Sequence, residues 1–283
     1  RYIQDHNDVM TLLHTLDNVA QPDDAIFLDR AEYTLMFMNY FKTPALFVTL
    51  PYVPGEVYGP EGPVVTSDDL RVLIGEDSQY ALDWTADHYE RLWLIASSSP
   101  FEAEKIRPIE HYLVEHYFPV RELELEGIPI PRAIQFLTTD APMGNPTTEV
   151  EATFGEIVSL NGIDFPNGTT FSAGDGIPIS LSWEPINTID FNHNIGIYLV
   201  GSNGVVTDRN GQPQGTFGNM MQWEVGETYR DNHGLIVPED TPSGQYQLLL
   251  AVYNWQDGQR LTVTTDSVEV IDNALVLATI TVE

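Results

Sequence analysis

The first 140 residues alternate helical and extended patterns of hydrophobic residues. Apolar side chains recur every three or four positions from Val9 to Val19, which indicates an amphipathic helix with one buried stripe. Continuously apolar segments at residues 25–28, 45–50 and 91–96 predict strands that are buried on both faces. Because such strands alternate with helices, residues 1–140 are expected to form a Rossmann-like α/β domain with a mostly parallel sheet and three layers.

The period of the hydrophobic pattern changes to two in the second half of the chain. Ile177, Ile179 and Leu181 alternate with polar residues, as expected of strands with one buried face. Further short extended segments follow, separated by turns rich in Gly, Asn, Asp and Pro. This spacing predicts an all-β, immunoglobulin-like sandwich over residues 151–283.

A segment rich in proline and glycine lies between the two patterns. Pro142, Gly144 and Pro146 interrupt both helices and central strands, so residues 141–150 are expected to be a linker. A length of 283 residues is sufficient for two separate cores. The predicted fold class is therefore a Rossmann-like α/β domain followed by an immunoglobulin-like sandwich.

Composition restricts the classes of function. Acidic residues number 42 and basic residues 12, and the resulting net charge of −30 would repel a phosphate backbone, so no nucleic-acid partner is expected. The chain has no cysteine, which excludes disulfides, thiolate metal ligands and a cysteine nucleophile. No apolar run approaches the ~20 residues of a membrane-spanning helix. The chain begins at Arg1 inside a helical pattern, which predicts a segment cut from a longer protein.

Two patterns that suggest metal sites fail on spacing. His111 and His116 are five residues apart on a predicted helix, which places them roughly 140° apart around its axis, whereas a zinc-binding helix separates its histidines by four residues. Residues 208–211 resemble the start of a calcium loop, but no glutamate closes that loop at its twelfth position. We therefore expect neither a metal site nor a cofactor.

Polar residues follow the predicted strands of the first half, at the edge where a parallel sheet binds ligands. These candidates are Asp29 and Arg30, Tyr52 and Tyr58, and Ser97 and Ser98. A sheet without a ligand is the favoured interpretation, because no glycine-rich phosphate loop and no nucleophile elbow follows any of the strands. An α/β-hydrolase-like enzyme that depends on Ser97 or Asp29 ranks last, since no base lies near any serine, and no catalytic residue is predicted.

Trp255 is the best candidate for a contact with a sugar. It lies at a predicted hairpin end beside Gln256, Asp257 and Gly258, where an aromatic ring is expected to be exposed. Trp183 shares the parity of the buried positions in its strand and is expected in the core instead. A sugar-binding sandwich therefore remains an alternative function.

A series of short motifs in the second half carries a resemblance to a known family. The motifs are Phe154-Gly155-Glu156-Ile157, Ile179-Ser180-Leu181-Ser182-Trp183, Val205-Val206-Thr207-Asp208-Arg209, Trp223-Glu224-Val225-Gly226-Glu227 with Asp231, Val237-Pro238, Pro242-Ser243-Gly244-Gln245-Tyr246, and Tyr253 with Gly258-Gln259-Arg260-Leu261. With them, the second half resembles the C-terminal region of bacterial polytopic membrane glycosyltransferases related to the protein O-mannosyltransferase (family 39) group. The first half resembles the α/β region that links these sandwiches to the last membrane helix, through its Arg91-Leu92-Trp93-Leu94 strand and the Ser/Pro loop after it.

The resemblance implies a parent enzyme that transfers a sugar from a polyisoprenyl-phosphate donor. Its catalytic acids would lie in a loop between membrane helices that these 283 residues do not include, so no catalytic residue is carried over. It further implies an extracytoplasmic location, a membrane tether, the parent's own transmembrane domain as a partner, and a glycan or protein acceptor. The leading hypothesis is a non-catalytic extracytoplasmic region that positions the acceptor or shields the active site. The alternative is a secreted carbohydrate-binding β-sandwich protein.

Overall fold

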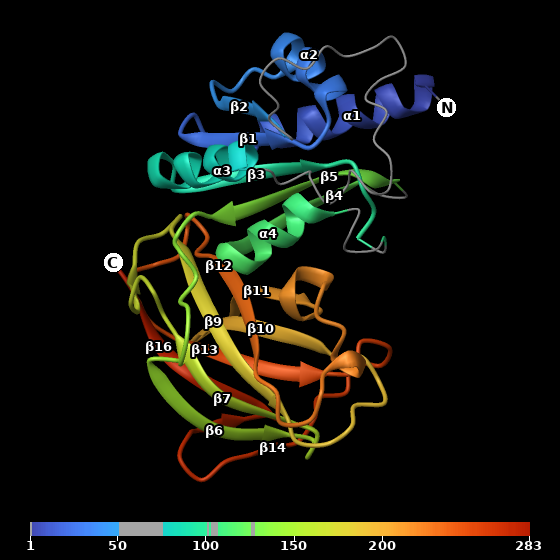
Figure 1. Ribbon diagram of the computed structural model, residues 1–283. Helices are drawn as coiled ribbons and strands as arrows, with labels where there is room; N and C mark the ends of the chain where they lie inside the picture. The colour runs from blue at the N-terminus through green and yellow to red at the C-terminus, as the bar shows by residue number, and fades with distance from the viewer. Residues whose placement is uncertain (1, 51–75, 101, 103–106, 126–127) are drawn as a thin grey trace. The chain divides into compact units, whose positions relative to one another are not determined.

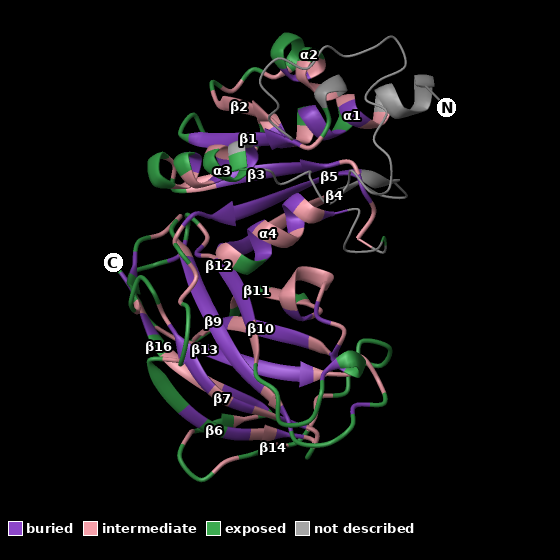
Figure 2. Cartoon of the chain, viewed as in Figure 1, coloured by how far each residue is buried: buried purple, intermediate pink, exposed green. Residues whose placement is uncertain are grey.

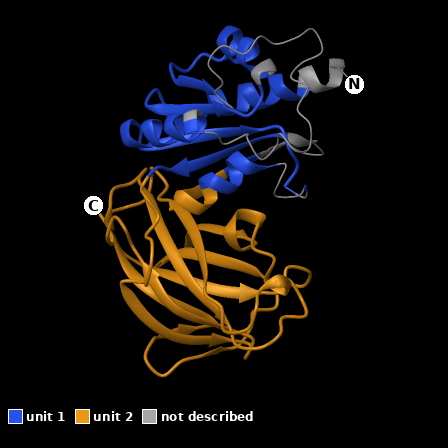
Figure 3. Ribbon diagram, in the orientation of Figure 1, with its two compact units in different colours: residues 1–113, 122–138 blue, residues 114–121, 139–283 orange. Residues whose placement is uncertain are grey.

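The protein is described by a computed structural model that covers residues 2–50, 76–100, 102, 107–125 and 128–283. The chain divides into two compact units, coloured separately in Figure 3. Unit 1 consists of residues 1–113 and 122–138, and unit 2 of residues 114–121 and 139–283. The chain therefore enters unit 2 for eight residues, returns to unit 1, and enters unit 2 again.

Unit 1 is built on a sheet with the strand order β2-β1-β3-β5-β4 (Figure 1). The strands are β1 (Asp24–Leu28), β2 (Leu46–Thr49), β3 (Arg91–Ala96), β4 (Phe118–Leu125) and β5 (Ile128–Leu137). The helices are α1 (Tyr2–Asp17), α2 (Ala31–Tyr40), α3 (Glu76–His88) and α4 (Pro108–His116). Strand β1 runs parallel to both β2 and β3, whereas β3 and β5 are antiparallel.

The predicted fold class, a Rossmann-like α/β domain followed by an immunoglobulin-like sandwich, is wrong. The described chain is mostly β, with three sheets and few helices, and the sheet of unit 1 is mixed. The physical reason is the short connection between β4 and β5, which are separated by only residues 126–127. Two residues cannot hold the crossover that a parallel neighbour needs. Continuous burial indicates a strand but does not reveal its direction.

Helix α1 confirms the predicted amphipathic helix. Its stripe of Val9, Leu12, Leu13 and Leu16 is buried in a cluster with residues of β1 and β3, among them Trp93. Each leucine that is fully removed from water in this way contributes about 1.5–3 kcal/mol. Tertiary packing of one apolar face therefore accounts for most of the stability of this helix.

Unit 2 contains two antiparallel sheets that face each other, which confirms the predicted β-sandwich (Figures 1 and 2). The first sheet has the order β12-β9-β7-β6-β14, formed by β6 (Thr148–Phe154), β7 (Val158–Asp164), β9 (Gly176–Pro185), β12 (Tyr229–Ile236) and β14 (Val263–Thr264). The second has the order β11-β10-β13-β16-β15, formed by β10 (Asn194–Gly201), β11 (Gly204–Gly211), β13 (Gly244–Tyr253), β15 (Val270–Ile271) and β16 (Ala274–Val282). A short strand, β8 (Thr170–Phe171), runs parallel to β16, and two 3-10 turns span Pro213–Thr216 and Met220–Gln222.

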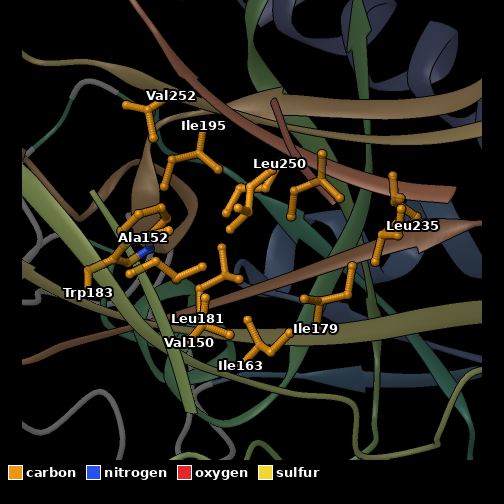
Figure 4. Close-up of a cluster of buried hydrophobic side chains, with 14 of the residues drawn as sticks. Val150, Ala152, Ile163, Ile179, Leu181, Trp183, Ile195, Leu235, Leu250 and Val252 are labelled. Carbon is orange, nitrogen blue, oxygen red and sulfur yellow. The ribbon is translucent and has the colours of Figure 1, made fainter. Parts of the chain in front are cut away.

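The core of unit 2 lies between the two sheets, as Figure 4 shows for Leu181, Trp183, Ile195 and Leu250. These side chains come from the alternate positions that the period of two predicts to be buried. Trp183 is fully buried, so the prediction that it belongs to the core is confirmed. Residues of the opposite parity on β10 and β13 face outward, which leaves Tyr198 and Tyr253 on the outer face of the second sheet.

Candidate functional site

The carboxyl ends of β1 and β3 lie side by side and bring two of the predicted residues together. The strands are parallel neighbours in a register that pairs Leu28 with Ile95, so the residues just after them meet at one edge of the sheet. The backbone N–H and the hydroxyl of Ser97 both donate to Asp29 Oδ2, at 2.7 and 2.9 Å. Asp29 and Ser97 thus form a direct hydrogen-bonded pair.

The pKa of the Asp29 carboxyl is unusually high. Burial raises its pKa from 3.8 to about 6, against the two hydrogen bonds from Ser97, which lower it, and the negative charge of Glu110 adds to the rise. Within the described part of the chain, the other oxygen, Oδ1, is buried and has no hydrogen-bond partner. This carboxyl therefore exchanges its proton close to neutral pH.

A buried ionic network that the sequence does not predict lies in the same unit. Arg132 reaches Glu110 at 2.6 Å and Glu122 at 2.9 Å, and its Nε donates to the Ser98 carbonyl at 3.1 Å. Arg107 completes the network through Glu110 at 3.2 Å. The network ties helix α4 to strand β5, and its buried members stabilise one another because an unpaired buried charge is costly.

Burial and charge oppose each other within this ionic network. Burial raises the pKa of Glu110 in spite of the two arginines beside it. Burial also lowers the pKa of Arg107. For Arg132, burial acts in the same downward direction, but the two carboxylates outweigh it and its pKa is raised. The one sequence signal for this network is the position of Arg132, which directly precedes the apolar segment at residues 133–137.

Of the remaining strand-end candidates, the two that the structure describes, Arg30 and Ser98, do not join the Asp29–Ser97 pair. Arg30 is exposed at the start of α2 and acts on Asp29 only by favouring its charged form. Ser98 contributes its carbonyl to Arg132. Tyr52 and Tyr58 lie outside the described residues.

A separate cavity of about 540 Å³ opens in unit 1 between the end of α1 and the segment after α2. Asp17 lies in its wall and holds that segment, because its Oδ1 accepts from the backbone N–H groups of Lys42 and Thr43 at 2.9 and 3.0 Å. His14 and Asn18 complete the polar part of the lining. None of the candidate site residues predicted from the sequence lines this cavity among the described residues.

Trp255 lies in the turn after β13, and its side chain is 54% exposed. One face of the indole stacks on Phe191, with ring centroids 6.1 Å apart and an angle of 17° between the planes. Phe191 in turn packs edge-on against His193, whose pKa is lowered by burial. Trp255 is thus a supported aromatic platform with its remaining surface in solvent.

A group of polar and aromatic side chains on the outer face of β10, β11 and β13 is termed the tyrosine network. It consists of Tyr198, Asp208, Asn210, Tyr253 and Arg260. Both tyrosine hydroxyls donate to Asn210 Oδ1, at 3.0 and 3.3 Å, and the Asn210 amide donates to Asp208. The Arg260 guanidinium lies 5.3 Å from the centre of the Tyr198 ring, within cation–π range.

Gly196 makes room for the tyrosine network. A Cβ added at this position would overlap the Tyr198 hydroxyl and crowd Asn210 Oδ1. Arg260 is fixed from the other side, because it donates to the Asp272 carbonyl at 2.9 Å. Burial raises the pKa of Tyr198, an effect that Arg260 opposes. The sequence does not predict this network, although a glycine inside a strand is a signal of close approach by another group.

Several residues of the family-like motifs meet in the core of unit 2. Asp231 is fully buried and accepts hydrogen bonds from Trp183 Nε1 at 3.3 Å, from His233 at 2.6 Å and from the Gln214 backbone at 2.7 Å. Trp223 stacks on Tyr229, with centroids 4.6 Å apart. These contacts indicate that the motif residues stabilise the packed core of unit 2.

Two observations concern metals and membranes. In the part of the chain that the structure describes, no three His, Cys, Asp or Glu side chains converge as ligands for a metal ion. Among the described helices, none combines the length and apolar character required to span a bilayer.

Comparisons with known proteins give only weak structural likeness. No family model and no curated protein matches the chain. A Niemann-Pick type C2 protein from Japanese carpenter ant is 8% identical with a TM-score of 0.28, over 50% of this chain and 99% of that one. A CARDB domain from Pyrococcus furiosus is 11% identical with a TM-score of 0.27, over 48% and 97%. The C-terminal domain of wzt is 15% identical with a TM-score of 0.32, over 49% and 82%. Likeness at this level identifies neither a family nor a function for the chain.

Proposed function

We propose that this chain is the non-catalytic, extracytoplasmic region of a membrane glycosyltransferase that uses a polyisoprenyl-phosphate sugar donor. In this proposal it is tethered through the parent's own transmembrane domain, and it positions a glycan or protein acceptor or shields the active site. The observation that supports the proposal is the spatial convergence of the motifs on which the family resemblance depends.

Motifs far apart along the chain contact one another in unit 2. Phe154 packs edge-on against Trp183, with centroids 5.6 Å apart, and Trp183 donates to Asp231. A Cβ added at Gly155 would come within 3.1 Å of the Leu261 side chain. Residues in such contact are energetically coupled, so a change at one alters the cost of a change at the other. The motif series therefore behaves as one fold signature, which supports descent from a common architecture over a chance match.

The family-like strand of unit 1 has equivalent support. Asp24 is fully buried and accepts from Arg91 Nε at 2.7 Å and from Trp93 Nε1 at 2.9 Å. The two polar side chains of the Arg91-Leu92-Trp93-Leu94 motif thus meet on one carboxylate. Their spacing of two residues follows from the strand, in which alternate side chains share a face.

The reading frame upstream of Arg1 provides the first test. The proposal predicts several apolar helices of about 20 residues each encoded there, and a start codon directly before Arg1 would contradict it. A phosphatase that folds only outside the cytoplasm, fused after Glu283 of the parent protein, should be active. In the purified parent enzyme, substitutions in unit 2 should raise the KM for the acceptor and leave the KM for the lipid-linked donor unchanged.

A second candidate function, carbohydrate binding by the sandwich, is favoured by the exposed indole of Trp255 held flat on Phe191. Calorimetric titration with a panel of oligosaccharides tests it, and Trp255→Ala should weaken the binding about tenfold or more. Trp84→Ala is the matched control, because Trp84 is 40% exposed and stacked on His88 in unit 1. A flat titration across all sugar classes would count against this function.

A further inference from the structure

We infer that the tyrosine network and Trp255 together form one binding site for a neutral pyranose oligosaccharide. In this site Trp255 supplies the stacking surface and the tyrosine network recognises the sugar hydroxyls. The inference rests on the second candidate function, carbohydrate binding by the sandwich, and adds to it the recognition residues and the class of sugar.

The two halves of the site belong to the same end of one pair of strands. Strand register pairs Asn194 of β10 with Tyr253, the last residue of β13. Trp255 follows Tyr253 by two residues, so their Cα atoms are at most about 7 Å apart. Phe191, which supports the indole, precedes β10 by three residues. Arg260 pairs with Tyr253 across the turn that carries Trp255.

The tyrosine network faces solvent rather than the core. Ile197 and Leu199 of β10 and Val252 of β13 are buried between the sheets, so their neighbours Tyr198 and Tyr253 point to the opposite side. Asp208 and Asn210 are exposed on the adjacent β11. These polar groups are therefore accessible to a ligand that lies across the strands.

The hydrogen-bonding capacity left in the tyrosine network matches sugar hydroxyls. Both tyrosine O–H groups are committed to Asn210 Oδ1. The Tyr198 hydroxyl also interacts with Arg260, which leaves the phenol oxygen of Tyr253 as an acceptor. The Asp208 carboxylate is a further acceptor, and the guanidinium of Arg260 carries donors beyond the one given to Asp272. A sugar hydroxyl both donates and accepts, so it can bridge such neighbouring acceptors and donors.

Two features favour a neutral pyranose over an acidic sugar. The aliphatic face of a pyranose ring is apolar, like the surfaces that stack on the electron-rich face of an indole. Acidic sugars are disfavoured by the net charge of −30 and by Asp208 and Asp272 beside the site. Arg260 offers little compensation, because it already contacts the Asp272 carboxylate at 3.4 Å.

The site is ordered before a ligand arrives. The Tyr198 hydroxyl donates to Asn210 and lies against Gly196, and the Arg260 guanidinium packs over the Tyr198 ring. The indole of Trp255 is held by Phe191. Side chains that are already fixed lose little conformational entropy on binding, which makes measurable affinity attainable from few contacts.

Calorimetric titration of the full chain tests the inference. The probes are cellohexaose, mannohexaose, oligogalacturonate and a chitosan hexamer. We expect at least one neutral hexasaccharide to bind at a single site, and to bind more tightly than oligogalacturonate. Trp255→Ala and Asn210→Ala should each weaken it about tenfold or more, the loss typical of a stacking contact or a set of hydrogen bonds. Tyr198→Phe should weaken it several-fold, whereas Tyr80→Phe, at a 71% exposed tyrosine on α3, should not change it.

Three results would overturn the inference, and they are distinguishable. In the first, a neutral glycan binds and Trp255→Ala weakens the binding, but Asn210→Ala and Tyr198→Phe do not. This result would refute the role of the tyrosine network in recognition and would leave carbohydrate binding by Trp255 supported. Tighter binding of oligogalacturonate or chitosan overturns the neutral class. No binding by any probe overturns both carbohydrate hypotheses. Far-UV circular dichroism and thermal melting of each variant establish that lost binding does not reflect lost folding.

Discussion

Replacement of Asp29 by asparagine should make unit 1 more stable at neutral pH and remove part of its pH dependence. The folded state holds the Asp29 proton more tightly than the unfolded chain, because burial raises the pKa from 3.8 to about 6. As pH rises through this interval, the unfolded state loses the proton first, so the contribution of Asp29 to stability falls and then stays low above about pH 6. Asparagine carries no charge to bury at any pH.

The magnitude follows from the size of the pKa rise. At about 1.36 kcal/mol per pKa unit, the rise from 3.8 to about 6 corresponds to at most about 3 kcal/mol. The residue keeps some exposure to solvent, so screening reduces the expected change to about 2 kcal/mol. In Asp29→Asn, the introduced side chain retains an oxygen for both Ser97 donors, while its amide takes the position of the unpartnered Oδ1, at a pH-independent cost of about 1 kcal/mol. The pH-dependent difference between the two proteins is therefore the quantity to measure.

Two measurements decide this prediction. Urea unfolding followed by far-UV circular dichroism gives the free energy of unfolding of both proteins between pH 4 and 7.5, and the advantage of the variant should grow by about 2 kcal/mol across that range. Carbon-13 NMR identifies the Asp29 carboxyl as the resonance missing from the variant and gives its pKa directly. Asp87→Asn, on the exposed side of α3, removes the same charge and corrects for the net charge of the chain. A stability difference that is constant over this range, or a measured Asp29 pKa near 4, would refute the reasoning.

Three further substitutions test other contacts. Ser97→Ala should raise the pKa of Asp29 further, because it removes a hydrogen bond to the charged form; NMR titration checks this, and an unchanged pKa would contradict it. Asp231→Ala should destabilise unit 2 by about 3–5 kcal/mol in urea unfolding, since it leaves two buried donors and one half-buried donor without their acceptor. A loss below about 1 kcal/mol would mean that they find other partners. Gly234→Ala should cost about 1–3 kcal/mol by overlap with Val120. Gly211→Ala, where the added Cβ would meet no neighbour, separates this packing cost from the general cost of replacing a strand glycine.

The sequence predicts local structure in this chain better than its topology. The stripe from Val9 to Leu16 and the parity of Ile179, Leu181 and Trp183 report burial directly, and burial is what the structure shows at these positions. The direction of β5 is different, because it depends on the length of the β4–β5 connection rather than on the residues inside the strand. The prediction of a mostly parallel sheet therefore failed at β5, because burial carries no information on the direction of a strand.

The candidate sites show the same division. The proximity of Asp29 and Ser97 follows from the neighbouring carboxyl ends of β1 and β3. The ion pair between Arg132 and Glu110 could not be predicted in this way. It joins residues 22 positions apart, and their proximity depends on a strand register that no local pattern specifies. The tyrosine network also depends on strand register, because Asn210 lies opposite Gly196 rather than beside either tyrosine in sequence. Pairing register is a property of whole sheets, so it is largely hidden from residue patterns.

The interleaved course of the chain has a consequence for how the two units can be separated. Residues 114–121 belong to unit 2, where the Asn232 amide donates to the backbone carbonyls of Val114 and Glu115, both at 3.1 Å. A fragment that begins at Thr139 would lack these acceptors and the Val120 side chain beside Gly234, so the buried side chain of Asn232 and its surroundings would be exposed to water. Genetic recombination at the proline-rich segment would therefore not transfer unit 2 as an intact cassette. The two units are therefore expected to be transferred by recombination as one piece.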